Sequence, residues 1–297
     1  MTEKIKKHRT VKIIILASIC LLLIASLVLN IYFLFFYDVS YLQSPDEIYI
    51  VESGIIKNNL EFAEGTDYNL KYDFSSEDYS VLKEKYDIEK IAGSGSEFEK
   101  ALNLMDEFAP RLYHKSDYDN HIALRALDLL EYSLDNKKQG INCRSKAQIL
   151  NEMCLALGIY SRKVWIMPNS SYDNDCHVVN EVWDESLNKW IMLDITNNQY
   201  WIDENGTPLS VLEIRSKGAN MEFCTPVEAE ESTDNPYKLK EKHLGEFLYI
   251  MKNMVYMEYC DEYSSYESEN FYLLFPENLV TSYEKIISSV SIEKSPE

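Results

Sequence analysis

The feature that most constrains this chain is an apolar stretch of 24 residues without a charge, from Ile13 to Phe36. As an α-helix it would be about 36 Å long, enough to cross the ~30 Å hydrocarbon core of a bilayer. A cleaved signal peptide is the alternative. The apolar run, however, continues through Leu27–Leu29 and Ile31–Phe36, past any plausible cleavage site. We therefore expect an uncleaved transmembrane helix over residues 13–36, followed by a folded domain.

The charges on either side of this stretch predict its orientation. Residues 1–12 form a basic tail with a net charge of +4, because five basic residues face Glu3: Lys4, Lys6, Lys7, Arg9 and Lys12. Acidic residues follow the span, beginning with Asp38, Asp46 and Glu47. Basic flanks stay on the cytoplasmic side of a membrane. We expect a cytoplasmic N-terminus and an extracytoplasmic C-terminal domain.

The overall charge limits the kinds of partner that the chain is expected to bind. The net charge is −20, so the chain beyond the basic tail carries −24. Nucleic-acid binding needs Lys and Arg against phosphate, so we expect no nucleic-acid partner. With 9 Gly and 22 Tyr, the composition is not that of a collagen-like or low-complexity chain. We therefore expect a soluble acidic domain that favours neutral or basic partners.

Three residues in the middle of the chain have the chemistry of a cysteine nucleophile. Cys143, His177 and Asp194 occur in this order, separated by 34 and 17 residues. A thiol becomes a good nucleophile as a thiolate, which an imidazolium stabilises. A carboxylate can in turn orient that imidazole and support its charge. We predict that these three are the catalytic residues.

Local patterns predict how the chain presents these residues. Cys143 opens a helix-like run with Asn142 as an acceptable N-cap and Gly158 as its stop. The thiol would then lie in the first helical turn, where partial positive charge favours the anion. From His177 to Trp183 the residues alternate as in a strand, and Trp190–Ile195 reads as the returning strand of a hairpin. Such a hairpin would bring Asp194 close to His177.

This stretch resembles the transglutaminase-like superfamily. In those domains a Cys opens a helix that ends near Leu-Gly-Ile, a His opens one strand, and an Asp ends the next. The matching segments here are Cys143, Ala156–Ile159, His177–Trp183 and Trp190–Asp194. The resemblance implies an α+β fold with a papain-like core, in which a Cys-bearing helix packs on an antiparallel sheet. It also implies thiol-dependent acyl transfer from peptide or glutamine amides, to water or to an amine.

One departure from the family pattern concerns the oxyanion hole. Many transglutaminases use a Trp upstream of the Cys as the second hydrogen-bond donor. All four Trp of this chain follow Cys143. The resemblance therefore leaves the second donor unassigned, and a non-catalytic, membrane-anchored binding or scaffold domain of the same fold is the alternative function.

The remaining cysteines and histidines do not predict a metal or a cofactor. Cys20 falls in the apolar stretch, and five cysteines follow it, an odd number that leaves at least one free or paired between chains. Cys176-His177 lies near Asp173 and Asp175, but the spacing typical of zinc ligands is absent. His114 and His121 precede Cys143, and either could contribute to a substrate cleft.

The sequence divides into five segments. They are the basic tail (1–12), the transmembrane helix (13–36), a stalk and N-terminal segment (37–95), the catalytic core (96–201) and a C-terminal extension that completes or covers the core (202–297). Within them we expect strands at Glu47–Val51 and in the C-terminal extension at Met254–Cys260 and Phe271–Phe275. A helix should begin at Asp119 or Asn120. The expected partners are the membrane and a peptide or protein substrate at the cell surface; the oligomeric state stays open.

Overall fold

The structure is a computed structural model of the chain, and it describes residues 2–35, 45–170, 173, 175–229, 236–279 and 287–290. The chain divides into two compact units, Met1–Ile48 and Tyr49–Glu297, which are described separately. Phe36 at the end of the predicted transmembrane helix, the start of the predicted stalk (residues 37–44) and parts of the C-terminal extension (residues 230–235, 280–286 and 291–297) lie outside the described residues.

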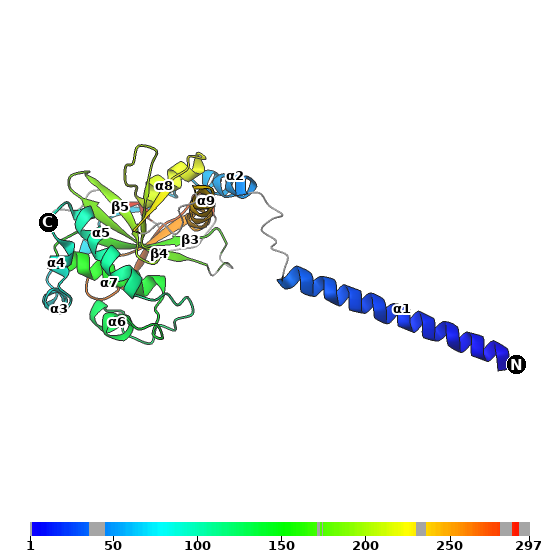
Figure 1. Cartoon of the computed structure of the whole chain (residues 1–297). Helices are drawn as coiled ribbons and strands as arrows, with labels where there is room; N and C mark the ends of the chain where they lie inside the picture. Colours follow the sequence, from blue (N-terminus) through cyan, green and yellow to red (C-terminus); the bar gives the residue numbers. More distant parts are fainter. Residues whose placement is uncertain are drawn as a thin grey trace. The chain divides into compact units, whose positions relative to one another are not determined.

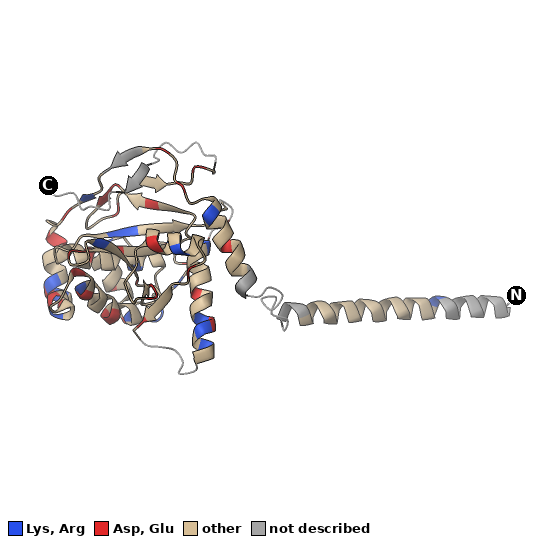
Figure 2. Cartoon of the chain, turned by 90° about the horizontal axis from the view of Figure 1, so that it is seen from above, with Lys and Arg blue, Asp and Glu red and all other residues tan. Residues whose placement is uncertain are grey.

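The first unit contains the long helix α1 (Thr2–Phe35). Within α1, the 21 residues Lys12–Tyr32 have a mean hydropathy of 2.8, and none of them is buried. In Figure 2 no residue between Lys12 and the end of this span has the colour of a charged residue. α1 is thus long and apolar enough to cross a membrane, as the sequence predicts.

The second unit is built around an antiparallel sheet of seven strands in the order β10-β8-β3-β4-β5-β6-β7. Its centre is the predicted hairpin, and the strands from the C-terminal extension join both edges. The strands are β3 (Ser161–Met167), β4 (His177–Asp184), β5 (Lys189–Asp194), β6 (Gln199–Ile202), β7 (Thr225–Glu228), β8 (Tyr256–Cys260) and β10 (Phe271–Leu274). The predicted α+β class, with a Cys-bearing helix on an antiparallel sheet, is confirmed.

Helices cover both faces of the sheet, with α3 to α7 grouped on one side and α8 and α9 on the other (Figure 1). Beyond α1, the α-helices of the described chain are α2 (Pro45–Asn58), α3 (Glu77–Tyr86), α4 (Ile88–Ala92), α5 (Glu97–Phe108), α6 (Ala126–Ser133), α7 (Cys143–Ala156), α8 (Val211–Ala219) and α9 (Pro236–Lys252).

The alternation of β4 explains these two layers. The Asn180 amide donates to the Ala147 carbonyl of α7 at 2.9 Å. The next residue, Glu181, points the other way and accepts from the Val211 N–H at the start of α8, also at 2.9 Å. Successive strand residues face opposite sides, so α7 and α8 lie on opposite faces of the sheet.

A buried ion pair lies within the α8 layer. Arg162 of β3 and Glu181 of β4 are 2.8 Å apart, and their side chains are 2% and 1% exposed. The guanidinium also lies 4.0 Å from the centroid of the Trp190 ring. Because Glu181 bonds Val211 as well, this pair connects two sheet strands to α8.

Two short parallel pairs connect the segment before the core to the end of the chain. β1 (Thr66–Tyr68) pairs with β11 (Ile287–Val290), and β2 (Lys71–Tyr72) pairs with β9 (Glu262–Tyr263). Tyr72 then stacks on Tyr263 with the ring centroids 5.5 Å apart. The N-terminal segment and the C-terminal extension therefore pack together beside the sheet.

Two local predictions were wrong. Glu47–Val51 lies in helix α2 rather than in a strand, because Tyr49, Ser53 and Ile56 recur at helical spacing and face the core. The helix expected from Asp119 or Asn120 begins instead at Ala126. Asn120 has a φ of +55°, a left-handed conformation that a right-handed helix cannot contain.

Candidate active site

Cys143 occupies the first turn of α7, as its sequence context predicts. The Asn142 side chain caps the helix by accepting from the Ser145 N–H at 3.0 Å. Gly158 ends the helix with a φ of +75°, and the Ile159 N–H returns to the Cys154 carbonyl at 2.9 Å, a pattern typical of a Schellman stop. These caps fix where the helix begins, and so place the thiol at its positive end.

The segment before α7 is held by a neighbouring stretch of chain. Ile141 forms a parallel bridge with His114, and the Ile141 N–H donates to the Tyr113 carbonyl at 3.0 Å. Gly140 permits this approach, because a Cβ there would lie 2.9 Å from the Lys115 Cβ. The two backbones therefore run close together, and His114 lies beside the entrance to the Cys143 helix.

The register of the hairpin brings His177 and Asp194 together. Asn180 pairs with Leu193, so Asp194 lies opposite Val179 and on the same face as His177, two residues along β4. The His177 Nε2 and Asp194 Oδ2 are 2.8 Å apart. Asp194 is fully buried, and its other oxygen accepts from the Thr196 N–H at 2.9 Å. The carboxylate is thus fixed by the β5–β6 turn.

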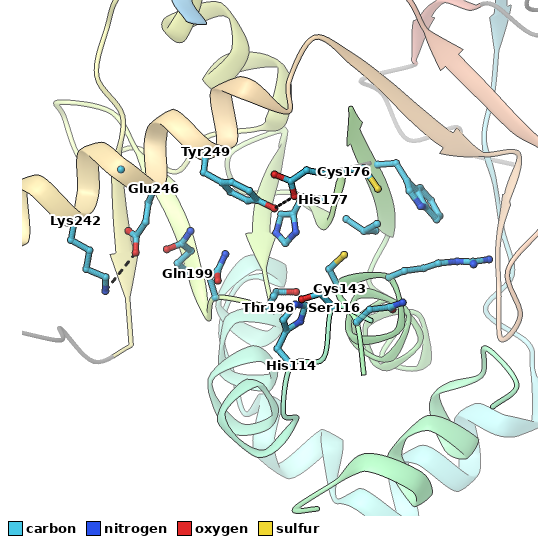
Figure 3. A pocket seen from close by; sticks show the side chains of 17 residues that line it. His114, Ser116, Cys143, Cys176, His177, Thr196, Gln199, Lys242, Glu246 and Tyr249 are labelled. Carbon is cyan, nitrogen blue, oxygen red and sulfur yellow. Dashed lines mark hydrogen bonds and ion pairs between the residues drawn. The ribbon is translucent and has the colours of Figure 1, made fainter. Parts of the chain in front are cut away.

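The opposite ring nitrogen of His177 faces Cys143. The ring lies within hydrogen-bonding reach of the thiol, and the Val178 N–H also points at the sulfur. Figure 3 shows the Cys143 and His177 side chains at the same opening. The structure therefore brings together all three residues singled out in the sequence, from α7, β4 and β5.

Their mutual contacts shift the protonation equilibria in a consistent direction. Burial alone would raise the pKa of the Cys143 thiol, but the hydrogen bond and charge of His177 lower it below its ordinary value. Burial opposes the charged imidazole, yet the charge and hydrogen bond of Asp194 raise the pKa of His177 to about 10. Asp194 is buried too, and His177 keeps its pKa low. This arrangement favours a thiolate–imidazolium pair at neutral pH.

A cavity of about 760 Å³ opens beside this cluster. Cys143 is partly accessible in it, while His177 forms its wall with only 3% of its surface exposed. Figure 3 shows side chains from α7, β4, the β5–β6 turn and α9 around the opening. Its polar lining includes His114, Ser116, Asn142, Arg144, Asp175, Thr196, Asn197, Gln199, Lys242 and Glu246. A peptide-sized ligand would therefore meet the thiol in a cleft whose lining carries many polar side chains among apolar surface.

The two histidines considered for this cleft differ in position. His114 lines the cavity, and burial lowers its pKa, so its imidazole is neutral at pH 7. His121 lies outside this cavity, against Asp119 and packed on Tyr118 with ring centroids 5.2 Å apart. Only His114 is thus positioned to meet a substrate at Cys143.

The sequence interpretation missed the contribution of α9. Lys242, Glu246 and Tyr249 line the cavity, and the Tyr249 ring contacts the His177 ring edge-on, with ring centroids 5.8 Å apart. These residues recur at steps of four and three, so they form one stripe of α9, beside the buried Phe247. That stripe was the available signal, but a stripe of polar residues is also what an exposed helix face shows.

The described residues contain no group of three His, Cys, Asp or Glu side chains placed to hold a metal ion. All six cysteines have free thiols in the structure. Cys154, Cys224 and Cys260 are buried, and burial raises the pKa of each to about 12. Of the cysteines in the second unit, Cys143 alone has a pKa lowered by its surroundings.

Residues 85–195 match the sequence model of the transglutaminase-like superfamily. The match runs from the end of α3 to the residue after Asp194, and so includes α7 and the hairpin. No protein with curated annotation matches the chain in sequence.

Two solved structures from bacteria are similar to parts of the chain. A candidate cysteine protease from Cytophaga hutchinsonii is 19% identical over 52% of this chain and 49% of its own, with a TM-score of 0.31. A candidate protease from Parabacteroides distasonis is 15% identical over 55% of this chain and 30% of its own, with a TM-score of 0.27. The chain thus spans about half of the first protein and less than a third of the second.

Proposed function

We propose that this chain, whose residues 85–195 form a domain of the transglutaminase-like superfamily, is a membrane-anchored cysteine enzyme of acyl transfer. Its substrates are peptide or glutamine amides. Cys143 is the nucleophile, His177 the base and acid, and Asp194 the residue that orients His177. The observation that supports this best is the His177 ring between a partly exposed thiol and a buried carboxylate, at the wall of an open cavity.

The reaction follows from these contacts. The Cys143 thiolate attacks the amide carbonyl, and a tetrahedral oxyanion forms. The His177 imidazolium then gives its proton to the departing nitrogen, which leaves as ammonia or an amine, and a thioester remains on Cys143. Neutral His177 next takes a proton from water or from an acceptor amine, which attacks the thioester. The thiol is restored when this second tetrahedral intermediate collapses.

The oxyanion needs hydrogen-bond donors on the side of the cavity opposite His177. The Cys143 N–H is in the first turn of α7, where backbone N–H groups lack partners within the helix. We assign the second donor to His114, which lines the same cavity and adjoins the entrance to α7 through its bridge to Ile141. A neutral imidazole retains one N–H. In this proposal His114 takes the place of the absent upstream Trp.

We further propose that α1 anchors the enzyme in a membrane, with residues 1–12 in the cytoplasm and the second unit outside. The uncharged span of α1 and the basic tail before it support this orientation. Residues 37–95 then form a stalk and N-terminal segment, residues 96–201 the catalytic core, and residues 202–297 the extension.

The test is incubation of the full chain, in nonionic detergent, with a glutamine-rich protein and with short peptide amides. Mass spectrometry should find deamidated, cleaved or cross-linked products that the Cys143→Ala chain does not make. Absence of such products, together with Cys143 labelling by a thiol probe that does not depend on His177, would favour the non-catalytic scaffold instead.

A further inference from the structure

A row of polar side chains leads away from the reacting thiol across one edge of the sheet. Asp194 of β5 is paired with Gln199 of β6, and Gln199 is paired with Glu228 of β7. Directly paired residues of antiparallel strands point to the same face, and neighbouring strands lie about 4.8 Å apart. Gln199 is therefore about 5 Å, and Glu228 about 10 Å, from the position of Asp194.

Helix α9 covers this row and adds a second carboxylate. Lys242 donates to both oxygens of Glu228 at 2.5 Å and lies 3.6 Å from Glu246, one turn along the helix. Two carboxylates thus share one lysine. Burial and the neighbouring charge of Glu228 raise the pKa of Glu246 to about 7, as expected where a second cation is missing. Figure 3 shows Lys242, Glu246 and Gln199 on one side of the cavity.

Two acceptors in this region have no hydrogen-bond partner among the described residues. They are Oε1 of Gln199, whose side chain is 1% exposed, and Oε2 of Glu246. A buried acceptor without a donor is unfavourable, so a ligand that brings a donor gains from satisfying it. The terminal torsions of Gln and Glu are soft, and either oxygen can turn toward the cavity.

Near Arg144, away from α9, positive groups outnumber the carboxylate that they contact. There Glu267 is bonded by both Arg144 and Lys163, so two cations share one carboxylate. Arg144 lines the cavity beside Cys143. Asp175, at the loop before His177, is paired with Lys252 at 3.1 Å. The cavity therefore has an acceptor-rich end at α9 and a cationic end at Arg144.

We propose that Gln199 and Glu246, backed by Glu228, form a subsite for a primary ammonium group of the substrate, in the same cavity as the amide that Cys143 attacks. This inference rests on the proposed function and names its substrate class: peptides with a lysine-like or amino-terminal ammonium beside the reacting amide. A carboxylate is disfavoured here, because the one cation of the subsite, Lys242, is already held by both oxygens of Glu228.

Three alkylating probes with the same iodoacetamide head test the subsite through Cys143 itself. They are N-ethyl-iodoacetamide, N-(2-aminoethyl)-iodoacetamide and its carboxylate analogue N-carboxymethyl-iodoacetamide. The ammonium lies about 6 Å from the reacting carbon. Site-resolved mass spectrometry on the full chain in nonionic detergent should show Cys143 reacting about tenfold faster with the ammonium probe than with the ethyl probe, the gain of one charged hydrogen bond.

The matched variants are Glu246→Gln and Glu241→Gln, which replace the same acid by the same neutral amide on the same helix. Glu241 is exposed and does not line the cavity. The ammonium preference should fall to about twofold in Glu246→Gln and stay near tenfold in Glu241→Gln. An equal preference in both variants, or fastest reaction with the carboxylate probe, would overturn the subsite.

The probes also separate this inference from the proposed function. An accessible thiol reacts with the ethyl probe whether or not the chain catalyses acyl transfer, so the charge preference can be measured in either case. If Cys143 reacts with none of the probes, saturation-transfer NMR on the Cys143→Ala chain takes their place. N-acetyl-ethylenediamine should then bind about tenfold more tightly than N-ethylacetamide, and equal binding would refute the subsite.

Discussion

Replacing Asp194 by Asn should reverse the polarity of the His177 ring while leaving the fold intact. All described donors to Asp194 are N–H groups: those of His177, Thr196 and Asn197. An Asn oxygen can keep the two backbone donors of the β5–β6 turn. Its NH₂ group then faces Nε2 of His177 and donates to it, so the ring proton must move to the nitrogen that faces Cys143. That nitrogen can no longer accept a proton from the thiol.

The magnitude follows from the geometry. With Nε2 and Oδ2 separated by 2.8 Å, the two charge centres lie about 4 Å apart, which is worth about 4 kcal/mol at an effective dielectric constant of about 20. That corresponds to about three pKa units. The pKa of His177, about 10 with the carboxylate present, would fall to about 7. The equilibrium between the ion pair and the neutral pair would shift by about 10³ toward the neutral pair.

The assay is the rate at which iodoacetamide modifies Cys143, resolved by site with mass spectrometry. At pH 6.5 we expect Asp194→Asn to slow the reaction by about 10²–10³. The difference between the two chains should disappear at high pH. Once the pH exceeds the ordinary pKa of a thiol, the thiolate forms without His177, so the labelling rates of the wild type and of Asp194→Asn should converge. Cys176, in the same cavity with a pKa raised by burial, is the internal reference. Equal Cys143 rates at pH 6.5 would refute the role of the carboxylate.

Three further substitutions test other parts of the structure. His114→Ala should lower amide turnover by about 10²–10³ but leave iodoacetamide labelling of Cys143 unchanged, because alkylation forms no oxyanion. His114→Gln should recover part of the turnover. An equal loss in both assays would contradict the role of His114 as an oxyanion donor. Arg162→Met should reduce the free energy of unfolding by about 3–5 kcal/mol in urea titrations followed by Trp fluorescence, since Glu181 is left buried without its cation. Adding Glu181→Gln should restore part of the lost free energy of unfolding. If it restores none, the loss comes from the packing of Arg162 and not from the unpaired charge. Gly140→Ala should cost about 1–3 kcal/mol in the same titration, because the added Cβ meets the Tyr113 carbonyl at 3.0 Å; an unchanged midpoint would show that the two segments can part.

The parts of the site that were predictable depend on local chemistry. Asn142 and Gly158 set the ends of α7 through their own caps, and the alternation after His177 set the face of β4. Once both strands of a hairpin are placed, their register fixes which residues meet across it. His177 and Asp194 could therefore be paired from the sequence.

The parts that were missed depend on contacts between distant segments. Glu246 is 52 residues beyond Asp194, and nothing local to α9 indicates which of its faces meets the sheet. The sequence does not show which of His114 and His121 reaches the cleft, whereas the bridge of His114 to Ile141 places His114 at the entrance to α7. The Glu47–Val51 error has the same origin, because a short apolar run fits a strand or a helix until its packing partners are known.

The pairing of β3 with β8 has a consequence for how the chain reaches its native state. β3 ends at Met167, and its partner on that side begins only at Tyr256, close to ninety residues later in synthesis. Until that late segment emerges, the strand next to the His177 strand presents an open row of N–H and C=O groups, which invites pairing with other chains. A fragment cut to residues 85–195 would keep that edge permanently, so we expect it to aggregate rather than fold. Folding of the second unit should therefore wait until β8, which ends at Cys260, has been synthesised.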